Sequence, residues 1–307
     1  VKVVPIPASL EERTFEQVVQ ALAADDRPLL DARRLRWVDP FGMLGLLAVG
    51  EVAAARGARP LLNLPDSPEV NSYLGRMGFF ERAAPLFELH GEARRGEESV
   101  SDVLLEITPI HSHGDVHSIV DRVNERAIAI LTRQLGYPIR EAAQFSVVLS
   151  EVCQNIVEHA QSNGWVAAQT YNWARRLGRK VAVIAVMDLG VGFQGSLAGP
   201  HAQRYGARWG DAAALEAAFL HGLTRFHDPG RGQGLQQVRR TVARWGGRIA
   251  IRSGTARIAD VPDWDDAPPL EENLAPFPGA QIAIVLPARV AETAPAPAGA
   301  TRRESRP

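Results

Sequence analysis

The sequence predicts an α/β protein of two domains, on the strength of its length, its alternating strand and helix patterns, and one charged break between them. The chain has 307 residues, of which 46% are hydrophobic and 22% charged, a balance typical of globular proteins. A chain of this length suggests about two domains. Residues 91–103 are charged, contain glycine and are poor in apolar residues, so we expect them to be the linker.

Residues 1–90 are expected to form a small α/β domain, because strand-length apolar runs alternate in them with a helical stripe. The runs are Leu29-Leu30 and 61–64. Between them, residues 41–56 carry apolar side chains at helical spacing. Asp39 can cap this helix and Pro40 fits its first turn.

Residues 104–290 are expected to form a second domain, with helices packed on one side of a sheet. Helical stripes cover 115–135 and 139–160, and the apolar run 181–187 has the length of a buried strand. Four further segments complete the domain: helices at 212–220 and 235–245, and strands at 248–251 and 281–286. This grouping predicts an α/β sandwich.

Two stretches look unlike ordered core. Residues 259–279 carry Asp, Pro and Asn with scattered apolar residues, and we expect a loop there. Residues 291–307 are rich in Ala, Pro and Arg, and we expect them to be a disordered tail.

Composition favours a cytoplasmic protein that binds neither nucleic acid nor membrane. The formal net charge is −1, so nothing calls for a polyanionic partner. One cysteine, Cys153, excludes a disulfide within the chain and favours a reducing compartment. No apolar run approaches the roughly 20 residues of a membrane span, and the first residues lack the pattern of a signal peptide.

Glu151, Asn155 and His159 follow one another at four-residue spacing, which places them along one side of a helix. A carboxylate and a carboxamide aligned in this way can hold a hard cation and orient a hydroxyl or water. Oxygen ligands suit Mg²⁺, which keeps waters and bridges to phosphates. Taken alone, such a triple is more often the solvated edge of an amphipathic helix.

A second motif, Asp188-Leu189-Gly190-Val191-Gly192, follows the buried strand. The strand delivers the Asp188 carboxylate to its C-terminal end, and the two glycines let a base or ribose approach the backbone closely. A carboxylate there can accept a hydrogen bond from the exocyclic amine of adenine. Taken alone, the motif is equally well a strand followed by a tight turn.

A third motif is a glycine-rich loop that opens a helix. Its glycines are Gly230, Gly232 and Gly234, and Leu235 follows them. Alternate glycines leave backbone N–H groups free to wrap a phosphate, and the helix N-terminus adds positive potential. Arg225 and Arg231 can pair with phosphate oxygens. The loop is not a Walker loop, because no lysine follows the glycines. It is not a dinucleotide fingerprint either, because it does not follow a first strand. The alternative interpretation is a flexible lid.

The order of these three motifs resembles that of the histidine-kinase-like (GHKL) ATPase superfamily, over residues 104–290. The resemblance implies a Bergerat α/β sandwich that binds ATP and Mg²⁺, with Asn155 as the metal ligand and Asp188 as the adenine anchor. The glycines would surround the nucleotide: Gly190 and Gly192 at the base, and Gly230, Gly232 and Gly234 at the phosphates, with Leu235 behind them.

The resemblance also implies a lid and shows one departure. Residues 193–229 would be the ATP lid, whose closure can couple nucleotide state to partner binding. The last strand of the superfamily usually begins Gly-Thr, whereas this chain has Gly279-Ala280. The missing hydroxyl is expected to weaken nucleotide affinity.

Within the superfamily, the single helix before the Glu151 helix looks like the anti-sigma-factor serine kinases. Sensor histidine kinases carry a two-helix hairpin with a mid-helix phosphoacceptor histidine, whereas here His111, His113 and His117 lie at a helix start. Exposed loop histidines are the simpler interpretation of this cluster, and a phosphorylated histidine or a metal site is the alternative.

The first domain is similar to the STAS domain of anti-sigma-factor antagonists. Those domains usually read Asp-Ser-Ser-Gly-Leu, and the corresponding stretch here is Asp39-Pro40-Phe41-Gly42. Pro40 and Phe41 occupy the two serine positions, so no hydroxyl remains there for a partner kinase to phosphorylate. An unrelated small α/β domain is the alternative.

Together these resemblances imply a serine/threonine kinase of a partner-switching system. Glu151 would orient or deprotonate a hydroxyl of a STAS-type partner, while positioning and charge neutralisation supply most of the rate. A sigma factor is the other partner implied, and a homodimer is implied by resemblance alone. One alternative is a nucleotide-gated binding module in which the serine-less domain is a fixed dock. A weaker one is an orphan histidine kinase with phosphate on His111, His113 or His117.

Overall fold

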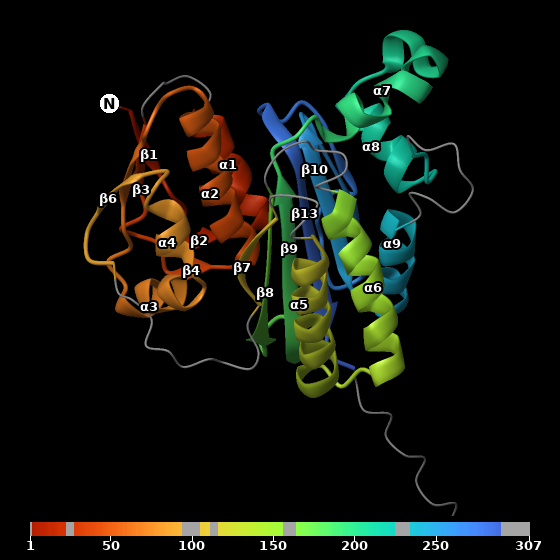
Figure 1. Ribbon diagram of the computed structural model, residues 1–307, viewed down its shortest axis with the longest axis horizontal. Coiled ribbons are helices and arrows are strands. Elements are labelled where there is room, and N and C mark those ends of the chain that lie inside the picture. The colour runs from red at the N-terminus through yellow and green to blue at the C-terminus, as the bar shows by residue number, and fades with distance from the viewer. Residues whose placement is uncertain are drawn as a thin grey trace, which may run out of the picture.

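The protein is described from a computed structural model. The structure describes residues 2–22, 28–93, 105–110, 116–155, 164–224 and 234–289, without the side chains of residues 116–120, 148, 151, 154 and 155. These residues form a mixed α/β protein with a parallel sheet in its first part and an antiparallel sheet in its second (Figure 1). Among the described helices, none is long and apolar enough to cross a membrane.

The first domain is built on a four-stranded parallel sheet in the order β1-β3-β5-β6. Its strands are β1 Val3–Pro5, β3 Leu29–Asp31, β5 Leu61–Asn63 and β6 Glu88–His90, and a separate pair is formed by β2 Ser9–Leu10 and β4 Trp37–Val38. Its helices are α1 Glu12–Leu22, α2 Pro40–Ala55, α3 Pro68–Arg76 and α4 Phe79–Ala83. The sequence predicted β3, β5 and α2, and it did not single out the others.

Helix α2 begins where the sequence placed it. The Asp39 carboxylate accepts the backbone N–H of Gly42 at 2.8 Å, and Pro40 occupies the first turn. The helix is buried continuously from Pro40 to Gly50, as expected for one that is apolar on every side. A Cβ at Gly42 would overlap the carbonyl oxygen of Leu10, so glycine allows the close packing of this helix on β2.

The second domain is built on a seven-stranded antiparallel sheet in the order β12-β11-β10-β13-β9-β8-β7. Its strands are β7 Leu105–Ile110, β8 Gly164–Trp173, β9 Arg179–Asp188, β10 Arg248–Gly254, β11 Ala256–Asp260, β12 Leu270–Glu271 and β13 Phe277–Pro287. The three predicted strands lie within β9, β10 and β13 and are confirmed. The prediction of a loop over 259–279 is wrong at both ends, which belong to β11 and β13, and at β12, an edge strand of two residues that is too short for a periodic pattern.

Helices α5, α6 and α9 cover one face of this sheet (Figure 1). The helices of the domain are α5 Val116–Ala129 with a π-helical extension Ile130–Gln134, α6 Ile139–Asn155, α7 Gly192–Tyr205 with a 3₁₀ turn Gly206–Arg208, α8 Asp211–Phe219, and α9 Gly234–Arg244. The predicted helices are confirmed within the described residues, and 156–160 lies outside them. The sequence did not predict α7, whose glycines and Pro200 are poor helix formers.

The first domain covers the other face of the large sheet (Figure 1). Side chains alternate along β9, so that Met187 lies in an apolar cluster shared with the first domain while Val186 lies in the cluster under the helices. Phe15 of α1 meets Phe277 of β13 edge to face, with ring centroids 5.5 Å apart. The two domains therefore share one continuous apolar core. Strand β6 ends at His90 and β7 begins at Leu105; residues 94–104, which include most of the expected linker, lie outside the described residues.

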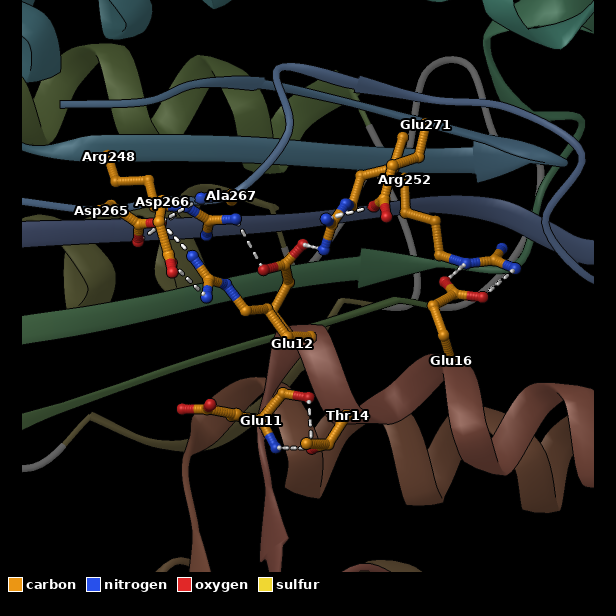
Figure 2. A network of polar contacts seen from close by, with 12 residues as sticks. Glu11, Glu12, Thr14, Glu16, Arg248, Arg252, Asp265, Asp266, Ala267 and Glu271 are labelled. Carbon is orange, nitrogen blue, oxygen red and sulfur yellow. Dashed lines mark hydrogen bonds and ion pairs between the residues drawn. The ribbon is translucent and has the colours of Figure 1, made fainter. Parts of the chain in front are cut away.

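A network of ion pairs crosses the same interface (Figure 2). Arg252 of β10 and Arg257 of β11 lie directly opposite each other in the strand pairing, an arrangement in which like charges repel. Carboxylates from α1 compensate them. Glu12, which is 8% exposed, pairs with Arg257 at 2.6 Å and with Arg248 at 2.8 Å, and Glu16 pairs with Arg252.

Candidate functional site

The three sequence motifs are carried by element ends that lie at one end of the large domain. Helix α6 ends at Asn155, β9 ends at Asp188 and α9 begins at Gly234. Figure 1 shows these three ends together, on the side where α7 and α8 project. Val186 packs under the helices, and by strand alternation Asp188 lies on that same face.

Asp188 is a buried carboxylate held by a backbone donor. Its side chain accepts the N–H of Gly190 at 2.8 Å, and the residue is 8% exposed. Burial raises the pKa of Asp188 to about 6, against the lowering effect of the backbone N–H groups of Gly190 and Ala280. A carboxylate offers roughly four acceptor positions. It therefore retains acceptor capacity for an amino group that approaches from the helix side.

Two glycines with positive φ lie in the segments next to Asp188. Gly279 has φ +76°, and a Cβ there would overlap the carbonyl oxygen of Asp188. Gly192 has φ +64°, and a Cβ there would lie 2.6 Å from the hydroxyl of Ser253. L-residues with a side chain rarely adopt such φ values. Glycine at both positions therefore lets the end of β9, the start of α7 and the start of β13 approach one another closely.

Ser253 joins these segments, and sequence reasoning missed it. Its hydroxyl, on a residue that is 1% exposed, donates to the carbonyl of Gly279 at 2.8 Å and accepts the N–H of Phe193 at 3.1 Å. It thus ties the end of β10 to the start of β13 and to the first turn of α7. A single serine at a strand end carries no periodic signal, so no sequence pattern could identify it.

The Gly279-Ala280 departure leaves the backbone of β13 beside Asp188 unchanged. The backbone N–H of Ala280 lowers the pKa of Asp188, and any residue except proline supplies such an N–H. The change from threonine to alanine therefore removes a hydroxyl near the site without removing this N–H.

Several predicted site residues lie outside what the structure describes. Glu151 and Asn155 stand in the last turns of α6, four residues apart, without described side chains. His159, His111 and His113 and the loop residues Arg225, Gly230, Arg231 and Gly232 lie outside the described residues altogether, and His117 is described only as part of α5. Gly234 begins α9 and is buried, and Leu235 packs against the core under the helices.

The described part of the expected lid, residues 193–224, is folded and is hydrogen-bonded to neighbouring elements at both ends of α8. Helix α8 begins with Asp211, whose carboxylate accepts the N–H and the hydroxyl of Thr255 at 2.9 and 2.8 Å. At the other end of α8, the side-chain amide of Gln236 in α9 donates to the carbonyl of Ala218 at 2.8 Å. The lid segment is thus held both to the β10–β11 turn and to the helix that follows the glycine loop.

The residues expected to bind Mg²⁺ and those expected to bind the nucleotide base lie in different parts of the chain. Within the described ranges, no group of three or more His, Cys, Asp and Glu side chains could hold a metal ion, and the expected ligand, Asn155, has no described side chain. The expected base-binding residues are better described, because the buried acceptor Asp188 lies close to Gly279 and Gly192, two positions at which a side chain is excluded.

Comparison with known proteins adds no relative. No protein-family model matches the chain, and no curated protein gives a significant match. The superfamily resemblance rests on the three motifs and their order.

Proposed function

We propose that the chain is an ATP-binding regulatory protein of the anti-sigma-factor serine/threonine kinase type, with the nucleotide between the sheet, α6 and α9. The observation that carries the proposal is Asp188, a buried acceptor at the end of β9 with Gly192 and Gly279 beside it. Adenine presents an amino group where guanine presents an oxygen. A fixed carboxylate would therefore favour adenine.

In this proposal the remaining motif residues surround the triphosphate. The glycine loop would wrap the phosphates, with Arg225 and Arg231 pairing to their oxygens. The Asn155 carboxamide would hold Mg²⁺, whose chemical contribution when bound would be to neutralise phosphate charge. Glu151 would orient the incoming hydroxyl and accept its proton as the hydroxyl oxygen bonds to the γ-phosphorus and ADP leaves with the broken P–O bond.

The hydroxyl would come from another protein. Pro40 and Phe41 supply no hydroxyl at the STAS-like position, and both are buried at the start of α2. Helix α2 packs against β8 and β9, on the sheet face opposite Asp188. The STAS-like position of this chain is therefore neither equipped nor placed to accept the phosphate, and a STAS-type protein with an intact serine is the substrate class that fits.

A second function, a nucleotide-gated binding module, is favoured by one observation. The first domain is held on the sheet by a shared apolar core and by buried ion pairs, so it acts as a fixed part of the nucleotide-binding domain. In this version ATP sets the position of the lid without phosphoryl transfer.

Isothermal titration of the full chain with ATP, ADP and GTP, with and without Mg²⁺, tests nucleotide binding. Asp188→Ala removes the acceptor at a cost of about 1–3 kcal/mol, which weakens ATP binding roughly 5- to 150-fold. Asp263→Ala, at an exposed aspartate of the same domain, is the matched control and should bind as the wild type does. Equal affinity for ATP and GTP would refute the role of Asp188.

Phosphate transfer separates the two functions. Wild type and Glu151→Ala are incubated with radiolabelled ATP and STAS-type proteins that carry an intact serine. Label on the partner that depends on Glu151 supports the kinase. Tight ATP binding without transfer, together with ATP-dependent partner binding, supports the binding module, and acid-labile label on the chain itself would indicate a histidine kinase.

A further inference from the structure

We infer that the first domain positions the candidate nucleotide site through three successive contacts: Glu16 to Arg252, the neighbouring Ser253 to Gly279, and the Gly279–Ala280 backbone to Asp188. The positioning itself is a property of the apo chain. Its consequence for ATP affinity rests on the proposed function.

The first contact is made by the guanidinium of Arg252, which reaches from β10 to α1 (Figure 2). The side chain is 2% exposed, and its Nε and Nη2 donate to the carboxylate of Glu16. Nη1 donates to the carbonyl of Gly254 at 3.1 Å, and Nη2 also donates to the carbonyl of Ala275. Because the guanidinium is planar and rigid, it fixes α1, the β10–β11 turn and the segment before β13 relative to one another.

The second contact starts one residue further along β10. Successive side chains of a strand point to opposite faces, so Arg252 faces the first domain while Ser253 faces away from it. Ser253 pairs with Ala280 in the strand register, and its hydroxyl holds both the carbonyl of Gly279 and the N–H of Phe193. A shift of the Arg252 backbone is therefore passed to the two turns that flank the site.

The third contact is between the start of β13 and Asp188. The Gly279 backbone lies so near to the Asp188 carbonyl that no side chain fits between them. The side-chain amide of Gln281, two residues further along β13, donates to the same carbonyl at 3.5 Å. The end of β9 that carries the Asp188 carboxylate is thus held in place by β13. At its start β13 carries Phe277, which packs against Phe15 of α1, so the first domain holds this strand from a second side.

The same interface provides a matched control. Glu12 is one turn before Glu16 on α1 and is the more buried of the two, at 8% against 16% exposed. It pairs with Arg248, whose strand partner in β13 is Val285, and with Arg257. Glu12→Gln therefore disturbs the domain interface at least as strongly as Glu16→Gln does, without touching the Arg252–Ser253–Gly279 connection.

Hydrogen–deuterium exchange of the full apo chain tests the positioning. In Glu16→Gln and in Ser253→Ala, we expect peptides that cover residues 187–195 and 277–283 to exchange at least about threefold faster, as one lost hydrogen bond implies. Glu12→Gln should lower the melting temperature and leave these peptides unchanged. Unchanged exchange in Glu16→Gln, or the same increase in Glu12→Gln, would overturn the inference. If Glu16→Gln does not fold, Glu16→Asp, which keeps the charge and shortens the reach, replaces it with the same expected pattern.

ATP titration tests the functional consequence. Glu16→Gln and Ser253→Ala should each weaken ATP binding about 3- to 10-fold, while Glu12→Gln changes it less than about twofold. Since both variants break one connection, the double variant should bind about as weakly as the weaker single variant, instead of showing the product of the two effects. A multiplicative double variant would refute the shared route. If the wild type binds no nucleotide, the proposed function fails, and the exchange experiment still decides the positioning.

Discussion

Asp39 makes the stability of this chain depend on pH in a direction opposite to that of a salt-bridged aspartate. The residue is 7% exposed at the start of α2, and burial raises the pKa of its carboxyl from 3.8 to about 8. The N–H groups of Gly42 and Phe41 favour the charged form, whereas Glu11 and Glu12 oppose it. Two partly buried tyrosines also face it, Tyr73 of α3 and Tyr171 of β8, whose pKa values lie above the ordinary value, mainly because of desolvation.

The sign follows from proton linkage. Between pH 4 and pH 8 the folded chain holds a proton on Asp39 that the unfolded chain has lost, so the free energy of unfolding falls as pH rises through this window. One pKa unit corresponds to about 1.36 kcal/mol. From pH 5 to pH 9, with a folded pKa of about 8, the loss is at most about 4 kcal/mol.

Asp39→Asn isolates this effect. Asparagine keeps an acceptor oxygen for the Gly42 N–H and is an equally good N-cap, but it cannot ionise. We expect the free energy of unfolding of Asp39→Asn, relative to wild type, to increase between pH 5 and pH 9 by at least about 1 and at most about 4 kcal/mol.

Urea unfolding at pH 5, 7 and 9, followed by tryptophan fluorescence and circular dichroism, measures this difference. Asp263→Asn, at an exposed site, is the control and should follow the wild type at every pH. If the free energies of unfolding of Asp39→Asn and wild type change with pH in parallel, the conclusion that the buried Asp39 resists ionisation is refuted.

Three further predictions concern the core and the site. Gly279→Ala should destabilise the fold by about 2–4 kcal/mol, because the new side chain meets both a positive φ and a backbone overlap. Gly57, which has φ +74° and open space around it, is the control, and Gly57→Ala should cost about 1 kcal/mol. Equal losses of unfolding free energy in urea would contradict the overlap at Gly279. Glu12→Ala should cost up to about 3–5 kcal/mol, because the buried Arg248 and Arg257 lose a shared carboxylate and keep only Asp265 and Glu271 as partners. Asp266→Ala, at an exposed ion pair, should change the urea midpoint little, and an equally small effect of Glu12→Ala would mean that water reaches the network. Cys153 of α6 is buried, and burial raises the pKa of its thiol to about 12. A thiol reagent at pH 8 should therefore label it only after unfolding. Fast labelling of the native chain would show that α6 opens readily.

Long periodic patterns in the sequence were sufficient to identify several elements of the fold. A continuous apolar run gave β9 and placed Asp188 at its end, helical stripes gave α5, α6 and α9, and the Asp39–Pro40 pair marked the start of α2. These features are local, because capping, strand alternation and helical spacing act between residues that are near in the chain. The candidate adenine acceptor was for the same reason accessible to sequence reasoning.

What covers the second face of the large sheet could not be predicted from local sequence patterns. Strand β10 reads Arg248-Ile249-Ala250-Ile251-Arg252, which by alternation alone predicts arginines in water. They are buried instead, because α1 brings Glu12 and Glu16 to them from 236 residues away. Burial of a charge depends on a partner in space. The same is true of Ser253, whose role depends on two turns that meet only in the folded chain.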